Sequence, residues 1–325
     1  MARIQVTPEL EHHVAWDGGD GREFLKDRSN SSRLPKGFIS RIRFIRAETK
    51  RLSPDLVHAH SSWAGVYVRL AMLGTPVVYE PHCFKFDDPN TRQLLRRIYR
   101  GAEWLLARRT AGFGTLSEHE AKLVKGLGPD LQIVHIPNVP TVGPRSGGAP
   151  LSTDNRQFSR VVMVGRICRQ KDPKFFVRVV KELRTLGSML EPVWIGDGDS
   201  DLKQYLLQNN IVVTGWVDAS ALVQALDGAI YCHSASYEGF PLSVLDAAQV
   251  GAPIVARSIP ALDGTPITSR ETPKAIAFEI ASLSASSARQ EEAQRANVSL
   301  LSTYNVETLR RQLLALYAKA YEVTG

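Results

Sequence analysis

The sequence predicts an α/β protein with two doubly wound parallel-sheet domains, and three observations support this prediction. Short runs rich in β-branched and aromatic residues alternate with stretches whose apolar residues recur at helical spacing. Strand–helix–strand repeats of this kind form parallel sheets covered by helices. A segment rich in Gly, Pro and Ser, residues 143–156, divides the repeats into two groups. The chain has 325 residues, 43% of them hydrophobic, which is enough for two such domains.

The first domain is expected over residues 1–142. Its strands are predicted at 56–60, 76–80, 112–116 and 132–138, and its helices at 38–52, 61–73 and 92–109, with a further helix that begins after Ser117 as its cap. The stretch 16–37 is polar and glycine-rich without a clear period, so we expect it to be loop or poorly ordered. Residues 1–40 contain no evident apolar strand followed by a glycine-rich turn, and the first unit of this domain is therefore expected to be degenerate or truncated.

The second domain is expected over residues 143–305, and a last helix lies within 306–325. Strands are predicted at 161–164, 192–195, 211–215, 229–232, 254–256 and 275–278, helices at 173–186, 201–208, 220–226, 241–250, 282–301 and 306–323, and a loop at 258–272. Sheets of this kind bind ligands beyond the carboxyl ends of their strands. The turns that follow the predicted strands are therefore the first places to look for a site.

The net formal charge is +7, and the excess lies in the first half of the chain: residues 1–140 carry 21 Lys and Arg against 15 Asp and Glu. It concentrates in Arg41–Arg51, for which we favour an ordinary amphipathic helix, and in Arg92–Arg109, which has apolar residues at helical spacing with cations between them. Two interpretations of the second segment stay open. It is either a helix that rests on anionic lipid or an anionic acceptor, or an ordinary amphipathic helix whose apolar side is core. No nucleic-acid partner is expected.

The three cysteines, Cys83, Cys168 and Cys232, lie in or beside apolar segments and lack a CxxC spacing, which favours reduced thiols over disulfides or a zinc site. The sequence shows neither a signal-peptide pattern nor a run of about 18 apolar residues. We therefore expect a cytoplasmic protein. If Arg92–Arg109 binds lipid, the protein would be peripheral on the inner face of the plasma membrane.

The segment 231–257 combines local structure, charge and potential chemistry. It predicts a buried strand, a polar turn at 234–239, and a helix that begins near Pro241. The first amides of a helix lack intrahelical partners and carry partial positive charge. The turn Gly239–Leu242 is therefore a potential anion cradle, suited to a phosphate.

Two carboxylates frame this turn. Glu238 precedes it and Asp246 follows eight residues later, close to the same helix face. Carboxylates beside a phosphate are unfavourable unless they accept hydrogen bonds from hydroxyl groups, and a sugar supplies such groups. On spacing alone, a capped surface helix with two solvated acids remains an open alternative.

A second turn, after the predicted strand 161–164, carries Arg166 and Lys171. An arginine can contact two oxygens and a lysine acts as a point charge, so the pair suits a diphosphate; two exposed basic side chains in a loop are the alternative. Asp197 and Asp199 follow the next strand and could hold Mg²⁺ or Mn²⁺. We favour a helix-capping role for these acids and expect no metal site, since the two cations already supply positive charge.

The segment EGFPLSVLD, Glu238–Asp246, resembles the E-x7-E signature of the retaining GT-B glycosyltransferases of family 4, also called glycosyl transferases group 1, with Asp in place of the second Glu. GRICRQK, Gly165–Lys171, is similar to the family's G-R-x4-K motif. The resemblance covers roughly residues 38–323. It implies a GT-B fold, in which two Rossmann-like domains face a cleft and the helix within 306–325 crosses back to the first domain.

The resemblance also implies residue roles. Glu238 would contact the donor sugar, and Asp246, one methylene shorter than the family's Glu, would hold the ribose hydroxyls. PDLVHAH and VVYEPHCF are similar to the segments that place a histidine against the donor sugar, and His82 is the better match. Ser117 lies in a segment that faces the cleft in the family, and Val217 in the loop that supports the nucleobase. The candidate residues are His82, Arg166, Lys171 and Glu238 for catalysis, and Gly165, Val217, Gly239, Phe240, Pro241, Leu242, Asp246, Ser117 and His60 for substrate binding.

The activity so implied is transfer of a sugar from a nucleoside-diphosphate donor, with UDP or GDP favoured, to a hydroxyl of a glycan or lipid-linked acceptor, with retention of configuration. It would serve cell-surface glycan, exopolysaccharide or glycolipid synthesis and need no cofactor. A nicotinamide dehydrogenase is disfavoured because a G-x-G-x-x-G motif after a first strand is absent. An epimerase of the same fold is disfavoured because no added acid–base pair is evident. The alternative that remains is a non-catalytic sugar-nucleotide-binding or scaffold protein of the same fold.

Overall fold

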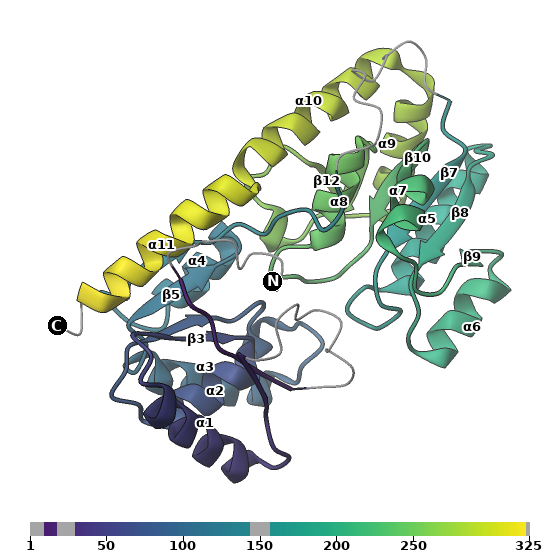
Figure 1. Ribbon diagram of the computed structural model, residues 1–325. Helices are drawn as coiled ribbons and strands as arrows, with labels where there is room; N and C mark the ends of the chain where they lie inside the picture. Colours follow the sequence, from purple (N-terminus) through teal and green to yellow (C-terminus); the bar gives the residue numbers. More distant parts are fainter. Residues whose placement is uncertain (1–9, 18–29, 144–156, 323–325) are drawn as a thin grey trace. The chain divides into compact units, whose positions relative to one another are not determined.

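The structure, a computed structural model, describes residues 10–17, 30–143 and 157–322 (Figure 1). They form two compact units, which we treat separately. Unit 1 comprises the described residues of 1–116, 120–136 and 306–325, and unit 2 those of 117–119 and 137–305. Both units are α/β with parallel sheets, so the predicted fold class is confirmed.

Unit 1 contains a four-stranded parallel sheet in the order β3-β4-β5-β6. Its elements are β3 (Val57–His60), β4 (Val77–Glu80), β5 (Gly112–Thr115), β6 (Ile133–His135), α1 (Phe38–Leu52), α2 (Ser62–Leu70), the 3₁₀ turn η3 (Lys85–Asp87), α3 (Gln93–Ala107), α4 (Glu118–Lys125) and the last helix α11 (Val306–Glu322). The strand order follows the sequence, and the crossover connections between successive strands allow them to run parallel.

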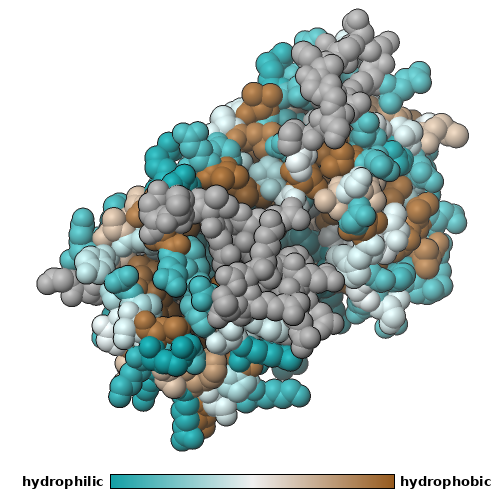
Figure 2. All heavy atoms as spheres, viewed as in Figure 1, coloured by the Kyte–Doolittle hydropathy of each residue, from teal (hydrophilic) through white to brown (hydrophobic). Residues whose placement is uncertain are grey.

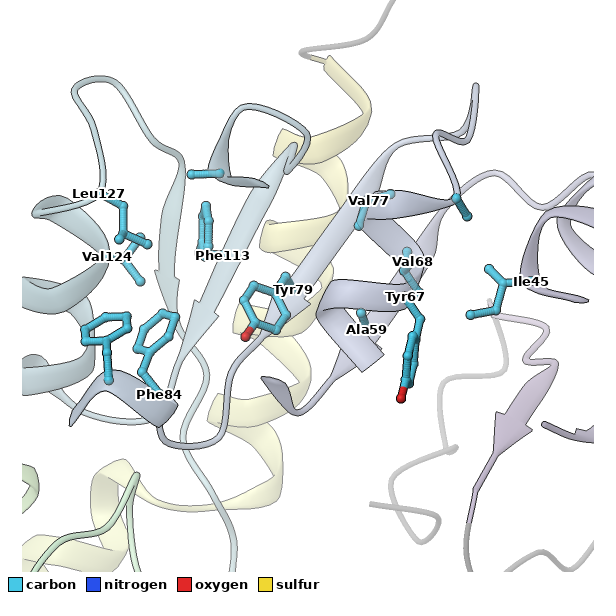
Figure 3. Close-up of a cluster of buried hydrophobic side chains, with 13 residues drawn as sticks. Ile45, Ala59, Tyr67, Val68, Val77, Tyr79, Phe84, Phe113, Val124 and Leu127 are labelled. Carbon is cyan, nitrogen blue, oxygen red and sulfur yellow. The ribbon is translucent and has the colours of Figure 1, made fainter. Parts of the chain in front are cut away.

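Side chains alternate between the two faces of this sheet. One face carries the core residues Tyr79 and Phe113, whose ring centroids are 5.9 Å apart. This face packs against α2, and α1 packs against α2 and adds Ile45 to the same core (Figure 3). The other face is covered by α11, which passes behind the strands in Figure 3. A Cβ on Gly112 would lie 2.8 Å from the Leu316 side chain, so the missing side chain lets α11 approach the sheet.

A second, two-stranded parallel sheet is made by β1 (Val14–Trp16) and β2 (Ser31–Arg33). The prediction that residues 16–37 are loop or poorly ordered is therefore wrong at β2, and β1 was not predicted. Strands of three residues in a polar stretch are too short to show the alternation of apolar and polar residues by which a strand is recognised. The glycine-rich stretch between them lies largely outside the described residues.

Unit 2 contains a six-stranded parallel sheet in the order β12-β11-β10-β7-β8-β9. Its elements are β7 (Arg160–Val164), α5 (Pro173–Thr185), β8 (Glu191–Ile195), α6 (Ser200–Gln208), β9 (Val212–Val213), α7 (Ala219–Leu226), β10 (Ala229–His233), α8 (Leu242–Val250), β11 (Ile254–Arg257), the 3₁₀ turn η4 (Pro260–Leu262), β12 (Thr268–Arg270), α9 (Pro273–Ala285) and α10 (Ser287–Thr303). The strands β7, β10 and β11 are buried almost throughout, as expected for a parallel sheet covered on both faces.

Two predictions for this unit are wrong. Residues 275–278 belong to α9 and not to a strand, because Thr272 caps the helix and Pro273 stands in its first turn. The predicted loop 258–272 contains β12, which pairs with β11. A four-residue apolar run cannot be assigned to strand or helix by periodicity alone.

The visible surface of both units shows hydrophilic and hydrophobic residues side by side (Figure 2). Among the helices that the structure describes, none combines the length and the apolar character needed to span a bilayer.

Candidate functional site

The sequence order of the strands in unit 2 reverses at the neighbouring pair β7 and β10. In open parallel sheets, ligands bind at such a switch point, beyond the carboxyl ends of the strands. The turn after β7 contains Gly165, Arg166 and Lys171, and the turn after β10 contains Glu238. The topology therefore brings the two motif segments to one place.

Lys171 and Glu238 form an ion pair, and only 17% of the Lys171 side chain and 11% of the Glu238 side chain are exposed. Gln170 supports this pair, since its Nε2 donates to the Glu238 carboxylate at 3.2 Å and to the Tyr237 carbonyl at 3.1 Å. The Ser236 amide donates to the Gln170 carbonyl at 2.8 Å. These contacts hold the two turns together. Gln170, which the sequence analysis did not single out, lies inside the G-R-x4-K match and could have been found there.

Two glycines allow this close approach. Gly165 has a φ of +146°, and a Cβ at this position would lie 3.0 Å from the Lys171 side chain. A Cβ on Gly196, in the turn after β8, would lie 2.2 Å from the Gly165 carbonyl oxygen. That carbonyl accepts a hydrogen bond from the Trp194 indole at 2.9 Å. A side chain at either glycine would therefore displace backbone or the ion-paired lysine.

Arg166 is exposed, and its guanidinium makes no hydrogen bond or ion pair with the part of the chain that the structure describes. Arg169, three residues later in the same turn, is also exposed. Arg166 thus keeps its hydrogen-bond donors available to a ligand. Arg169 is therefore a suitable control residue for tests of the role of Arg166.

The helix α8 begins at Leu242, three residues after the motif glycine Gly239. Gly239, Phe240 and Pro241 are buried, whereas Leu242 is exposed. Pro241 adopts the N-cap position with φ −76° and ψ 118°, and no side chain caps the helix. The first-turn amides carry the positive end of the helix dipole, which suits an anion.

The Asp246 carboxylate is buried and already hydrogen-bonded. It accepts from the Thr141 amide at 2.6 Å, from the Thr141 hydroxyl at 2.8 Å and from the Val142 amide at 3.3 Å. Burial raises the pKa of Asp246, and these donors oppose the shift. The predicted ribose contact stays a prediction, and it would compete with these bonds. No sequence signal pointed to Thr141, because its partner is more than 100 residues away.

The acidic pair after β8 has protein partners. The Asp199 carboxylate caps α6 by accepting from the Asp201 and Leu202 amides at 3.1 and 3.0 Å. Asp197 accepts from Lys203 at 3.1 Å. The capping predicted for Asp199 is confirmed. Val217, in the loop after β9, is exposed beside Trp216.

In unit 1, the candidate histidines His60 and His82 lie together at the carboxyl ends of β3 and β4, with His60 Nδ1 3.0 Å from His82 Nε2. Burial lowers the pKa of His60 to about 3 and also lowers that of His82, so both imidazoles are neutral near pH 7. Ser117, which belongs to unit 2, follows β5 and is buried.

The backbone at His82 is in an unusual conformation. His82 and Cys83 have φ values of +50° and +86°, in the left-handed region that side chains other than glycine seldom adopt. Glu120 supports this turn, because its carboxylate accepts from the Cys83 amide and from the Leu116 amide, both at 2.8 Å. Burial raises the pKa of Glu120 to about 7. The sequence analysis did not identify this supporting role.

Comparison with known proteins agrees with the fold and the motifs. Residues 159–286 match the family model described as "Glycosyl transferases group 1", and residues 9–139 match that of a "Glycosyl transferase 4-like domain". A UDP-Gal:alpha-D-GlcNAc-diphosphoundecaprenol alpha-1,3-galactosyltransferase of Escherichia coli is 26% identical over 246 residues, which are 69% of this chain. The match spans 62% of that protein, less than two thirds of its length.

Solved structures show the same fold at low identity. Sucrose-phosphate synthase from Thermosynechococcus elongatus has a TM-score of 0.74 and 15% identity, covering 98% of this chain and 87% of that one. The Anabaena protein HepE, solved in complex with UDP, has a TM-score of 0.70 and 14% identity, covering 89% and 86%. The chain has a two-domain GT-B fold. The two domain matches and this fold support a glycosyltransferase family.

Proposed function

We propose that this protein is a retaining glycosyltransferase of family 4 that moves a sugar from a nucleoside-diphosphate sugar to an acceptor hydroxyl. The observation that carries the proposal is the paired Lys171 and Glu238 at the switch point of unit 2, beside the exposed Arg166 and the uncapped start of α8. This arrangement joins positive charge for a diphosphate with a carboxylate that can accept hydrogen bonds from sugar hydroxyls.

The proposed chemistry is electrostatic. When the bond between sugar and diphosphate breaks, negative charge develops on the leaving diphosphate. Arg166, Lys171 and the first amides of α8 are placed to stabilise that charge, so no Mg²⁺ or Mn²⁺ is required at the diphosphate. Glu238 would orient the donor sugar, and for His82 a contact with the donor sugar rests on the motif resemblance alone. Retention of configuration and front-face displacement rest on the motif resemblance.

The donor and acceptor classes are also proposals. The galactosyltransferase relative is named for a UDP-sugar donor and a lipid-linked diphosphate acceptor, and HepE was solved with UDP. We propose a UDP-sugar donor and a lipid-linked or glycan acceptor for this chain, in cell-surface polysaccharide synthesis. A cytoplasmic location beside the membrane follows from such substrates.

A membrane contact through α3 is supported by its exposed face. Leu94, Ile98 and Leu105 recur at i, i+4 and i+11 and are 69%, 54% and 59% exposed, so they are not core residues. The opposite side of the helix, with Glu103 and Leu106, is buried. Exposed arginines flank the apolar stripe at 97, 100 and 108. An apolar stripe flanked by cations suits an anionic lipid surface, which would hold the acceptor in place.

The test of the proposed function is a panel of UDP-, GDP- and ADP-sugars titrated into the protein and followed by calorimetry. We expect binding of a UDP-sugar and, with a lipid-linked acceptor, a product whose anomeric configuration, read by NMR, equals that of the donor. Binding without turnover on any acceptor would favour the non-catalytic scaffold. An inverted product would refute retention, and no binding at all would refute the proposal.

A further inference from the structure

His58, His60 and Glu80 in unit 1 place three metal-ligand side chains on one face of the sheet. His58 and His60 are two residues apart on β3 and so point to the same side. Glu80 is the register partner of His60 on β4. A Cβ on Gly114 of the next strand would lie 2.5 Å from the Glu80 side chain, so the glycine provides the room that this carboxylate occupies.

The ligand atoms converge. His58 Nε2 lies 3.1 Å from Glu80 Oε1, and His60 Nδ1 lies 3.7 Å from Glu80 Oε2. One nitrogen of each histidine and a carboxylate oxygen all lie within 4.8 Å of one another. Metal–ligand distances of about 2.0–2.2 Å place tetrahedral ligands about 3.4 Å apart. The two separations from Glu80, each to a different carboxylate oxygen, bracket that value, so both imidazoles and the carboxylate could reach one ion after side-chain adjustment.

The Glu80 carboxylate needs a partner because it is buried. The ion-pair contacts that the structure describes for this carboxylate are with the imidazoles of His58, His60 and His82. A cation bound among these side chains would offset the cost of burying the carboxylate.

His58 shows the hydrogen-bond pattern of a metal ligand. Its Nε2 is buried and lacks a hydrogen bond of acceptable geometry, although it points at Glu80. Its other nitrogen, Nδ1, lies 2.9 Å from the Tyr317 hydroxyl on α11. Metal-bound histidines commonly donate their second N–H to such a partner, which fixes the ring. Tyr317 can therefore hold His58 with Nε2 free for the metal.

We propose that His58, His60 and Glu80 bind one divalent transition-metal ion of the Zn²⁺ class, with Tyr317 orienting His58. Two imidazoles and a carboxylate are a ligand set for zinc, whereas Mg²⁺ prefers oxygen ligands alone. His82 lies beside this ligand set, with its Nε2 3.5 Å from Glu80 Oε2 and 3.0 Å from His60 Nδ1. This site belongs to unit 1 and goes beyond the proposed transfer, in which the diphosphate is met by Arg166 and Lys171 in unit 2.

The test is zinc content and affinity of the full chain. Protein stripped with a chelator is titrated with ZnCl₂, and retained zinc is measured after dialysis by mass spectrometry. We expect about one Zn²⁺ per wild-type chain and loss of retained zinc in His60→Ala. Tyr317→Phe should bind Zn²⁺ about 10–100-fold more weakly, the usual effect of removing the hydrogen-bond partner of a metal-binding histidine.

The matched control is His13→Ala, which removes another histidine of unit 1 that lies outside the cluster. This variant should retain zinc. MgCl₂ in place of ZnCl₂ should give no retention.

His60→Ala could lose zinc by misfolding, so circular dichroism and a cobalt titration of the wild type accompany the measurement. Co²⁺ bound by these ligands should give visible absorption bands that ZnCl₂ removes by competition. Wild-type protein that retains no more zinc than His60→Ala and gives no such bands would overturn the proposal. Equal zinc retention in the wild type and a folded His60→Ala variant would also overturn it.

Discussion

The Asp246 carboxylate accepts hydrogen bonds from both the backbone amide and the hydroxyl of Thr141, at 2.6 and 2.8 Å. Asp246, to which the motif assigns the ribose, thus also holds the backbone at Thr141 and Val142. We expect Asp246→Ala to lower the free energy of unfolding by about 1–3 kcal/mol, because it leaves buried donors without an acceptor. Urea unfolding measures this, with Thr141→Val, which removes the hydroxyl alone, as the milder comparison. An unchanged stability would show that these bonds contribute nothing net.

The ribose role of Asp246 is tested separately by nucleotide binding. If the carboxylate also reaches the ribose, Asp246→Ala should weaken UDP binding by about 1.5–3 kcal/mol, the value for a hydrogen bond to a charged group. Asp246→Glu restores the family residue and should bind UDP as well as the wild type or slightly better. Calorimetry with UDP and with 2′,3′-dideoxy-UDP identifies the contact. A loss in Asp246→Ala that is equal for both nucleotides would assign the residue to the Thr141 contact alone.

The exposed stripe on α3 predicts binding to anionic membranes. Wild-type protein should sediment with vesicles containing phosphatidylglycerol, not with phosphatidylcholine alone, and should be released at high salt because the attraction is screened. The double variant Arg97→Glu, Ile98→Ser should not sediment with vesicles, because it removes an apolar contact with the lipid and reverses one charge. The matched control is Lys181→Glu, a charge reversal on the exposed side of α5 in unit 2. Equal sedimentation with both lipids would leave α3 an ordinary surface helix.

Glu120 predicts a pH dependence of stability. Its pKa is raised from an ordinary value of 4.5 to about 7, first by burial. The folded state therefore binds the Glu120 proton more tightly, and this contribution to stability is present below about pH 4.5 and lost as the pH rises to about 7. Relative to Glu120→Gln, the wild type should lose stability between pH 5 and pH 8, as measured by urea unfolding at each pH. A stability difference that is the same at both pH values would contradict the raised pKa.

Local patterns predicted most of the fold because each depends on residues close in sequence. Helix α1 begins and ends at the predicted residues, 38 and 52, and the strand–turn–helix around Glu238 follows from an apolar run, a polar turn and Pro241. The same patterns fail for short elements. β1 and β2 are too brief to show a period, and 275–278 has the composition of a strand but is held in α9 by its cap.

The candidate site was predictable to the extent that its residues lie in motifs. Arg166, Lys171 and Glu238 could be named from their spacing and resemblance, and the strand order explains why the segments meet. Contacts between distant segments were not predictable. Nothing local in the sequence pairs Asp246 with Thr141 or His58 with Tyr317, because these contacts exist only after the chain has folded.

Stabilisation of a leaving diphosphate by Arg166 is the central claim, and the matched pair Arg166→Ala and Arg169→Ala tests it most directly. Both arginines are exposed in the same turn, so neither change should affect folding. Sugar transfer from the donor identified by calorimetry, assayed without added Mg²⁺ or Mn²⁺, should fall about 10²–10³-fold in Arg166→Ala, the range for loss of one transition-state donor, and stay near the wild-type rate in Arg169→Ala. Equal rates in the two variants, or a wild-type rate that depends on added Mn²⁺, would contradict the account.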